Sequence, residues 1–134
     1  MARQKVVLDT NVFVAAGFNP NSASARIIEK IEQGELQMVW TEGTLEETRH
    51  IVSQIPPLSW EPFEGLFREE AQYQEPIHPE QFESVPDPAD RKFAALAQAA
   101  DAVLVSQDDD LLGHQSQVDV PIVHPGEFLS RLSD

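Results

Sequence analysis

Short runs of mainly apolar residues recur along the chain and predict strands. The runs are rich in β-branched side chains, which favour strands. Three of them are nearly unbroken, as expected of parallel strands that are covered on both faces. The four runs lie at 5–8, 36–40, 102–105 and 121–123.

Between these runs, apolar residues recur at helical spacing and predict five helices. Asn21-Ser22 caps a helix that Gly34 closes. Thr41 or Thr44 caps a second helix, which Pro56 stops. The other three are expected at about 59–73, from Asp87 through Ala100, and around 128–132. The expected order is β-α-β-α-α-α-β-β-α, with room for a short helical turn at 110–112.

This alternation predicts an α/β fold, a three-layer α/β/α sandwich with a mainly parallel central sheet. The 134 residues match the size of one domain, so we expect a single domain over 1–134. The stretch 56–86 is rich in proline and acidic residues. It still carries Trp60, Phe63 and Phe67 at helical spacing, so we interpret it as a variable insert inside the domain.

Charge and composition exclude several classes of function. The net charge is −14, from 23 acidic and 9 basic residues, and there is no cysteine. Nonspecific nucleic-acid affinity comes from Lys and Arg, so the charge argues against a general polyphosphate-binding surface. The lack of cysteine excludes a disulfide framework, a thiolate zinc site and a thiol nucleophile. No run reaches the roughly 18 apolar residues of a membrane span, and we expect a soluble, cytoplasmic protein without membrane contact.

Acidic residues follow the predicted strands at one edge of the sheet. Asp9 ends the first strand and Asp108 follows the third, while Glu46 or Glu47 and Asp90 lie on the intervening helices. Carboxylates that meet at the ends of parallel strands repel one another strongly, so either some of them are protonated or a cation is the missing partner. Oxygen ligands select Mg²⁺ or Mn²⁺, and such ions support hydrolysis of phosphodiesters.

Four segments together resemble the PIN domain family. They are 7–14, which contains Asp9-Thr10-Asn11 after an apolar strand, 41–47, 87–97 and 105–112. The resemblance runs over nearly the whole chain and is weakest from about 56 to 85. It implies an α/β/α fold and a Mg²⁺- or Mn²⁺-dependent ribonuclease. Many small prokaryotic members are toxins of toxin–antitoxin pairs, and this chain looks most like that stand-alone group.

The resemblance also implies the roles of individual residues. The catalytic and metal-binding acids are expected to be Asp9, Glu47, Asp90 and Asp108. Glu47 matches the family spacing better than Glu46, and neighbouring helical residues point about 100° apart, so only one of them faces the site well. The residues expected to orient carboxylates or waters are Thr10, Asn11, Ser106 and Asp110. The cations nearest to the site in sequence are Arg26, Arg49 and Arg91.

The leading interpretation is a metal-dependent endoribonuclease that acts as a toxin. The resemblance further implies a homodimer and a small antitoxin protein, whose basic segment can place arginine among the carboxylates. Two alternatives stay open. One is a catalytically weak PIN-like module that binds protein, favoured by the scarcity of cations. The other is a hydrolase of small phosphate esters, although the chain has neither an Asp-x-Asp strand end nor a glycine-rich phosphate loop.

Overall fold

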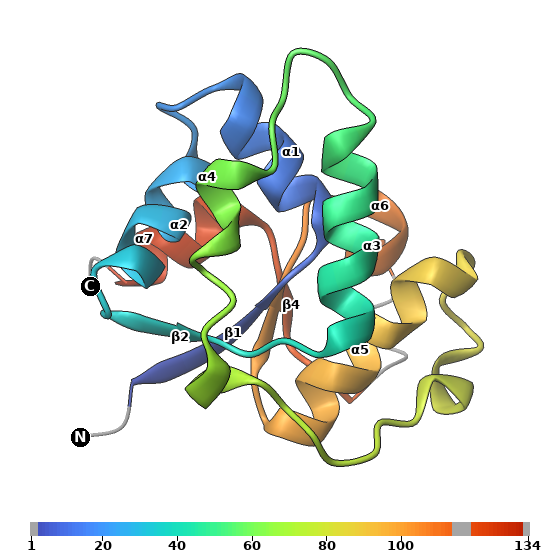
Figure 1. The fold of residues 1–134 in the computed structure, drawn as a ribbon. Coiled ribbons are helices and arrows are strands. Elements are labelled where there is room, and N and C mark those ends of the chain that lie inside the picture. The colour runs from blue at the N-terminus through green and yellow to red at the C-terminus, as the bar shows by residue number, and fades with distance from the viewer. Residues whose placement is uncertain (1–2, 114–118, 133–134) are drawn as a thin grey trace.

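Four parallel strands form the central sheet of the computed structural model, which describes residues 3–113 and 119–132 (Figure 1). They are β1 (Gln4–Leu8), β2 (Leu36–Met38), β3 (Val103–Val105) and β4 (Ile122–Val123), in the spatial order β2-β1-β3-β4. β1 is central and pairs with β3 through Val7 opposite Leu104 and Leu8 opposite Val105. The predicted parallel α/β sheet is therefore confirmed, and the carboxyl ends of β1 and β3 lie side by side.

Helices cover both faces of this sheet. Alternate side chains of β1 enter different cores, as the two-residue period of a strand requires. Val6 and Leu8 pack with α1 (Thr10–Phe18), α2 (Ala23–Glu32) and α7 (Pro125–Leu132). Val7 packs on the opposite face with α5 (Pro88–Ala100) and α6 (Asp109–Gly113). The three layers of the expected sandwich follow from these two cores.

Three helices begin at the caps that the sequence predicts. Ser22 Oγ accepts a hydrogen bond from Ala25 N at 3.1 Å and starts α2. Thr41 caps α3 (Glu42–Ser53), and Thr44 completes a capping box by accepting from Thr41 N at 3.0 Å. Asp87 caps α5. These predictions succeed because a cap is a local interaction between residues two or three positions apart.

Helix α1 is an element that the sequence pattern did not predict. It begins directly after Asp9 and carries the almost wholly apolar run Val12 to Ala16. An apolar run without a polar face has no helical period that distinguishes it from a strand or a loop. The helix is stabilised by burial, since Val12 and Phe13 are almost fully enclosed between the sheet and neighbouring helices.

The prediction of a long helix at 59–73 is wrong. The chain there forms only α4 (Glu61–Glu64) and the short 3₁₀ turn η1 (Glu69–Ala71), and η2 (Pro79–Phe82) follows. After η1 the backbone runs beside the end of β2, where Trp40 and Gln72 form a parallel bridge and Tyr73 N donates to Trp40 O at 2.8 Å. This pairing with a residue outside the segment overrides the helical spacing of the apolar residues within it.

The aromatic residues of this segment nevertheless anchor it, as expected. Phe63 and Phe67 lie 5.4 and 5.7 Å from Phe13, measured between ring centroids. Trp60 lies 5.4 Å from Phe67. Aromatic contacts of this kind add to the apolar area that each ring buries, so the segment belongs to the core of the domain.

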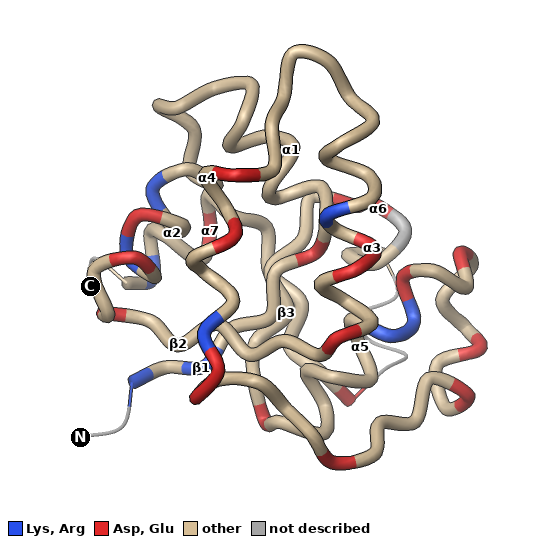
Figure 2. The backbone as a smooth tube through the Cα atoms, in the orientation of Figure 1, with Lys and Arg blue, Asp and Glu red and all other residues tan. Residues whose placement is uncertain are grey.

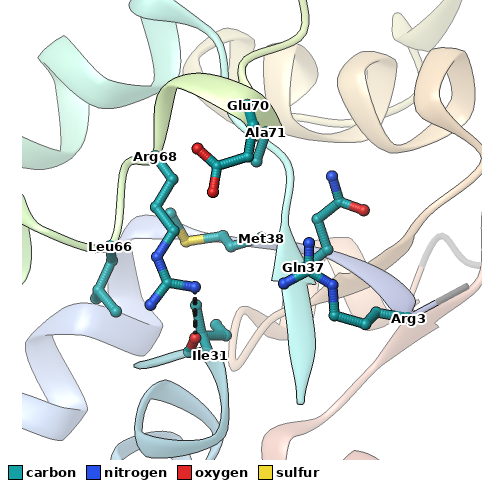
Figure 3. Close-up of a pocket in the computed structure, with 8 residues that line it drawn as sticks. All are labelled: Arg3, Ile31, Gln37, Met38, Leu66, Arg68, Glu70 and Ala71. Atoms are coloured by element: carbon teal, nitrogen blue, oxygen red, sulfur yellow. Dashed lines mark hydrogen bonds between the residues drawn. The ribbon is translucent and has the colours of Figure 1, made fainter. Parts of the chain in front are cut away.

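Arg68 fastens the same segment to the end of α2 (Figure 3). Its Nη1 donates to Ile31 O and its Nη2 donates to Glu32 O, each at 2.9 Å. The last carbonyls of a helix have no partner within the helix, and a cation there also complements the helix dipole. Arg68 therefore caps the C-terminus of α2, although it is far from α2 in sequence.

None of the helices in the described residues has the length and apolar character needed to cross a bilayer. Acidic residues are spread along α3 and through the segment between α4 and α5 (Figure 2). Basic residues lie at α2 and the N-terminal strand, and others lie on α3 and at the start of α5, in the same view. Acidic residues thus greatly outnumber basic ones along the chain from α3 to the first turn of α5.

We expect Arg68→Met to lower the free energy of unfolding by about 1–3 kcal/mol, because two charge-assisted hydrogen bonds are lost and Glu32 O loses its partner, while Ile31 O still accepts from Gly34 N. Urea denaturation measures the change. The matched control is Arg49→Met, which removes the same charge at an exposed position of α3 and is expected to change stability by less than about 0.5 kcal/mol. Equal effects of the two substitutions would contradict the role of Arg68.

Candidate metal centre

Asp9 lies at the junction between β1 and α1, where the strand ends and the helix begins. Its side chain is buried, with 2% exposed. Its backbone N donates to Val105 O at 3.1 Å, which continues the β1–β3 ladder by one residue. Ser106 Oγ donates to Asp9 Oδ2 at 2.8 Å and accepts from Asp108 N at 2.9 Å. Ser106 therefore links the two strand ends and orients both aspartates.

Three aspartates from three separate elements meet at this point. Each of Asp9, Asp90 and Asp108 offers a carboxylate oxygen, and these atoms lie within 4.8 Å of one another. Asp90 comes from the first turn of α5, where Asp87 caps the helix, and its side chain hydrogen-bonds that of Asp108. The parallel sheet and the Asp87 cap together place the three acids.

The close approach of these acids perturbs their ionisation. The pKa of Asp9 is raised to about 6, mainly by burial and also by the charge of Asp108, against the lowering effect of the Ser106 hydrogen bond. Burial, the hydrogen bond with Asp108 and the charges of Asp9 and Asp108 raise the pKa of Asp90 to about 8. Both shifts have the direction expected of carboxyls that lack a cationic partner.

The donor set fits a hard divalent cation. All three groups present carboxylate oxygens, which are the ligands that Mg²⁺ and Mn²⁺ prefer. Asp90 Oδ2 is buried and has no hydrogen-bond partner in the described part of the structure. A buried carboxylate oxygen without a partner is costly, and an ion held by the three aspartates would supply that partner.

Glu47 faces the same open pocket of about 230 Å³, which Asp9, Asp90 and Asp108 also line. Its carboxylate is not part of the three-aspartate group. Instead, Glu47 Oε1 lies 2.8 Å from Lys92 Nζ. Glu46 is exposed and does not line the pocket, so the helix presents Glu47 to the site, as its spacing predicts.

The expected supporting residues occupy different places around the pocket. Thr10 is buried, lines the pocket and lies 3.1 Å from Thr48, measured between the two Oγ1 atoms. Asn11 lines the pocket from its exposed edge. Ser106 contacts Asp9 directly. Asp110 belongs to α6, but its side chain lies outside the described part of the structure.

Lys92 is a residue of this site that inspection of the sequence missed. Arg91, its neighbour, donates instead to Val85 O at 2.9 Å and Glu83 O at 3.3 Å and holds the backbone before α5. The sequence contains no local signal for Lys92, because its contact with Glu47 depends on how α3 packs against α5. Only an expectation that a cation must balance Glu47 could have led to it.

Comparison with known proteins identifies the fold and family. The crystal structure of FitAcB from Neisseria gonorrhoeae is 18% identical, with a TM-score of 0.60, and the match covers 90% of this chain and 98% of that one. The crystal structure of PAE2754 from Pyrobaculum aerophilum is 17% identical, with a TM-score of 0.61 and coverage of 97% and 90%. The structure of FitAB bound to the IR36 DNA fragment is 18% identical, with a TM-score of 0.58 and coverage of 90% and 94%.

These similarities in structure agree with a similarity in sequence to one family. No curated protein sequence matches the chain significantly. The sequence profile of the PIN domain matches residues 5–110, which include all three clustered aspartates. The match spans most of the chain, and the protein therefore belongs to the PIN domain family.

Proposed function

We propose that this protein is a divalent-metal-dependent endoribonuclease that acts as the toxin of a toxin–antitoxin pair. The observation that carries the proposal is the meeting of Asp9, Asp90 and Asp108 within 4.8 Å, with one buried oxygen of Asp90 lacking a partner. Folding alone gives no benefit from such an arrangement, because like charges in a partly buried site repel. Membership of the PIN family supports nuclease chemistry as the use of this site.

In this proposal the three aspartates hold one or more Mg²⁺ or Mn²⁺ ions. When bound, such an ion supplies an acidified water and neutralises charge on the phosphate that is attacked. Asp9 stays oriented through the hydrogen bond from Ser106, and Asp108 N fixes Ser106 in turn. Thr10 and Asn11 line the same pocket, where they can orient substrate or water. RNA reaches these groups through the open side of the pocket.

The proposed partners follow from the family and from the surface charge. Many stand-alone PIN proteins are toxins, which implies a homodimer and a small antitoxin for this chain. Twelve acids and only Arg49 and Arg68 lie between Glu42 and Asp90, so a basic protein segment is the complementary partner. FitAB has been captured on a DNA fragment, and an assembly on DNA is part of the same proposal.

Asp9→Asn is expected to lower cleavage of single-stranded RNA in Mn²⁺ by about a hundredfold or more, since even residues behind a metal ligand cost 10–100-fold when changed. The variant should remain folded, because burial disfavours the charged form of Asp9. The control is Asp101→Asn, the same chemical change at an exposed residue in the left-handed conformation, which asparagine tolerates. Unchanged cleavage by Asp9→Asn would contradict the proposed activity.

The same RNA assay separates the two alternative interpretations. A module that only binds protein would cleave neither RNA nor an aryl phosphate, and it would take up no metal. A hydrolase of small phosphate esters would turn over an aryl phosphate and leave RNA intact.

Stability of the metal-free protein should fall as the pH rises. The pKa values of Asp9 and Asp90 are raised in the folded state from 3.8 to about 6 and about 8, so their contribution is fully present below pH 4 and is lost as pH rises through those values. For Asp9 alone the loss is on the order of 3 kcal/mol. Thermal denaturation in EDTA between about pH 5 and 9 measures it.

Mg²⁺ should reverse this loss, because a bound cation compensates the ionised carboxylates. We expect Mg²⁺ to raise the melting temperature more at about pH 8 than at about pH 5. Asp90→Asn should remove the part of the pH dependence near pH 8 and leave the part near pH 6 that comes from Asp9, and Asp101→Asn should leave the profile unchanged. A profile that is flat in the unaltered protein, or that Mg²⁺ does not alter, would argue against the metal site.

An arginine-rich peptide should compete with Mn²⁺ if a basic partner segment enters the carboxylate pocket. Arginine pairs with carboxylates in a bidentate manner, whereas lysine offers a point charge. Hexa-arginine is expected to weaken Mn²⁺ binding in calorimetric titrations by several-fold more than hexalysine. If both peptides leave the Mn²⁺ affinity unchanged, the proposed entry of arginine among the carboxylates is wrong.

A further inference from the structure

Lys92 reaches the edge of the candidate metal centre through its ion pair with Glu47. The Nζ and Oε1 atoms are 2.8 Å apart, and the two side chains are only 30% and 22% exposed. The pair joins α5, the helix that carries Asp90, to α3 on the other side of the pocket. A partly buried pair is screened less than one in open solvent, so the Lys92 ammonium compensates charge on Glu47.

The backbone of α3 is fixed beside this pair. Thr48, the next residue after Glu47, is buried, and its Oγ1 lies 3.1 Å from that of Thr10 on α1. Thr44 is also buried, and it completes the capping box with Thr41 at the start of the helix. Glu47 can therefore change partner only by moving its side chain. In the structure, that side chain is paired with Lys92, and the aspartates form their group without it.

A second divalent ion at Glu47 would have to share the carboxylate with the Lys92 ammonium. The repulsion between a doubly charged ion and an ammonium is twice that between two unit charges at the same distance. Two-ion nuclease sites need a carboxylate-lined position about 4 Å from the first ion. Glu47 is the acid on α3 that lines this pocket, and Lys92 already compensates it.

We propose that the Lys92 ammonium takes the place of a second divalent ion, so that the centre holds one ion, on Asp9, Asp90 and Asp108. The inference rests on the proposed function, since it requires that the aspartates bind a divalent ion at all. It assigns Glu47 and Lys92 to positioning and charge balance, whereas the resemblance to the PIN family implies a direct ligand role for Glu47.

Counting Mn²⁺ ions tests this assignment without any measurement of activity. Calorimetric titration with Mn²⁺, together with electron paramagnetic resonance of the free ion, should give one ion per chain for the unaltered protein. Lys92→Met should open a second position, with an affinity for the second ion at least about tenfold higher than in the unaltered protein, because the ammonium no longer repels it. The matched control is Lys30→Met, which removes the same charge from the ion pair with Glu35, 3.9 Å long and remote from the pocket.

A double substitution separates charge balance from metal ligation. Lys92→Met combined with Glu47→Gln keeps the net charge and should still bind one ion, with an affinity within about threefold of the unaltered protein. If Glu47 were a ligand of that ion, the affinity would fall by at least about tenfold. Because this variant removes both partners of the pair, it leaves no unpaired charge and decides the question even if Lys92→Met alone does not fold.

The outcomes distinguish the two proposals. No Mn²⁺ binding to the unaltered protein would overturn the proposed function itself. Four other outcomes would overturn only the assignment of Lys92. They are two ions in the unaltered protein, one ion in folded Lys92→Met, an equal gain in second-ion affinity in Lys30→Met, and a tenfold loss of first-ion affinity in the double variant. One ion in the unaltered protein, a second in Lys92→Met and unchanged first-ion affinity in the double variant would establish it.

Discussion

Repulsion among three clustered carboxylates is the constraint on which the rest of this structure depends. Asp9, Asp90 and Asp108 meet within 4.8 Å, and two of them have pKa values raised by burial and by one another. A fold selected only for stability would have no use for this cluster. The Ser106 bridge, the Asp87 cap and the Glu47–Lys92 pair hold acids at fixed positions or compensate them. They are the surroundings that a cation site requires.

The parallel sheet brings together aspartates that are far apart in sequence. β1 and β3 are neighbours although Asp9 and Asp108 are far apart in sequence. Their carboxyl ends therefore place both aspartates at one edge, where open α/β sheets generally bind ligands. Helix α5 then adds Asp90 from its first turn, and α3 adds Glu47 from the opposite side of the pocket. Acidic residues along α3 and in the segment between α4 and α5 (Figure 2) disfavour nonspecific binding of a polyphosphate chain there.

The sequence predicted best what depends on neighbours in the chain. The caps at Ser22, Thr41 and Asp87 start their helices as expected, since each acts on a backbone group a few residues away. Helix α1 was missed because its apolar run shows no polar face. The prediction of a helix at 59–73 is wrong because Gln72 pairs with Trp40, and the spacing of apolar residues within one segment carries no information about a contact with a distant segment. Convergence of the aspartates could be expected from strand ends, but the contact of Lys92 with Glu47 depends on the packing of two helices.

Diffraction from crystals soaked in Mn²⁺, recorded where manganese scatters anomalously, addresses the central claim most directly. The central claim is that the three aspartates hold a cation, and it predicts an anomalous peak between the carboxylates of Asp9, Asp90 and Asp108, in contact with the buried Oδ2 of Asp90. A map with no peak at this position, or with manganese only at other acidic groups of the surface, would contradict the claim.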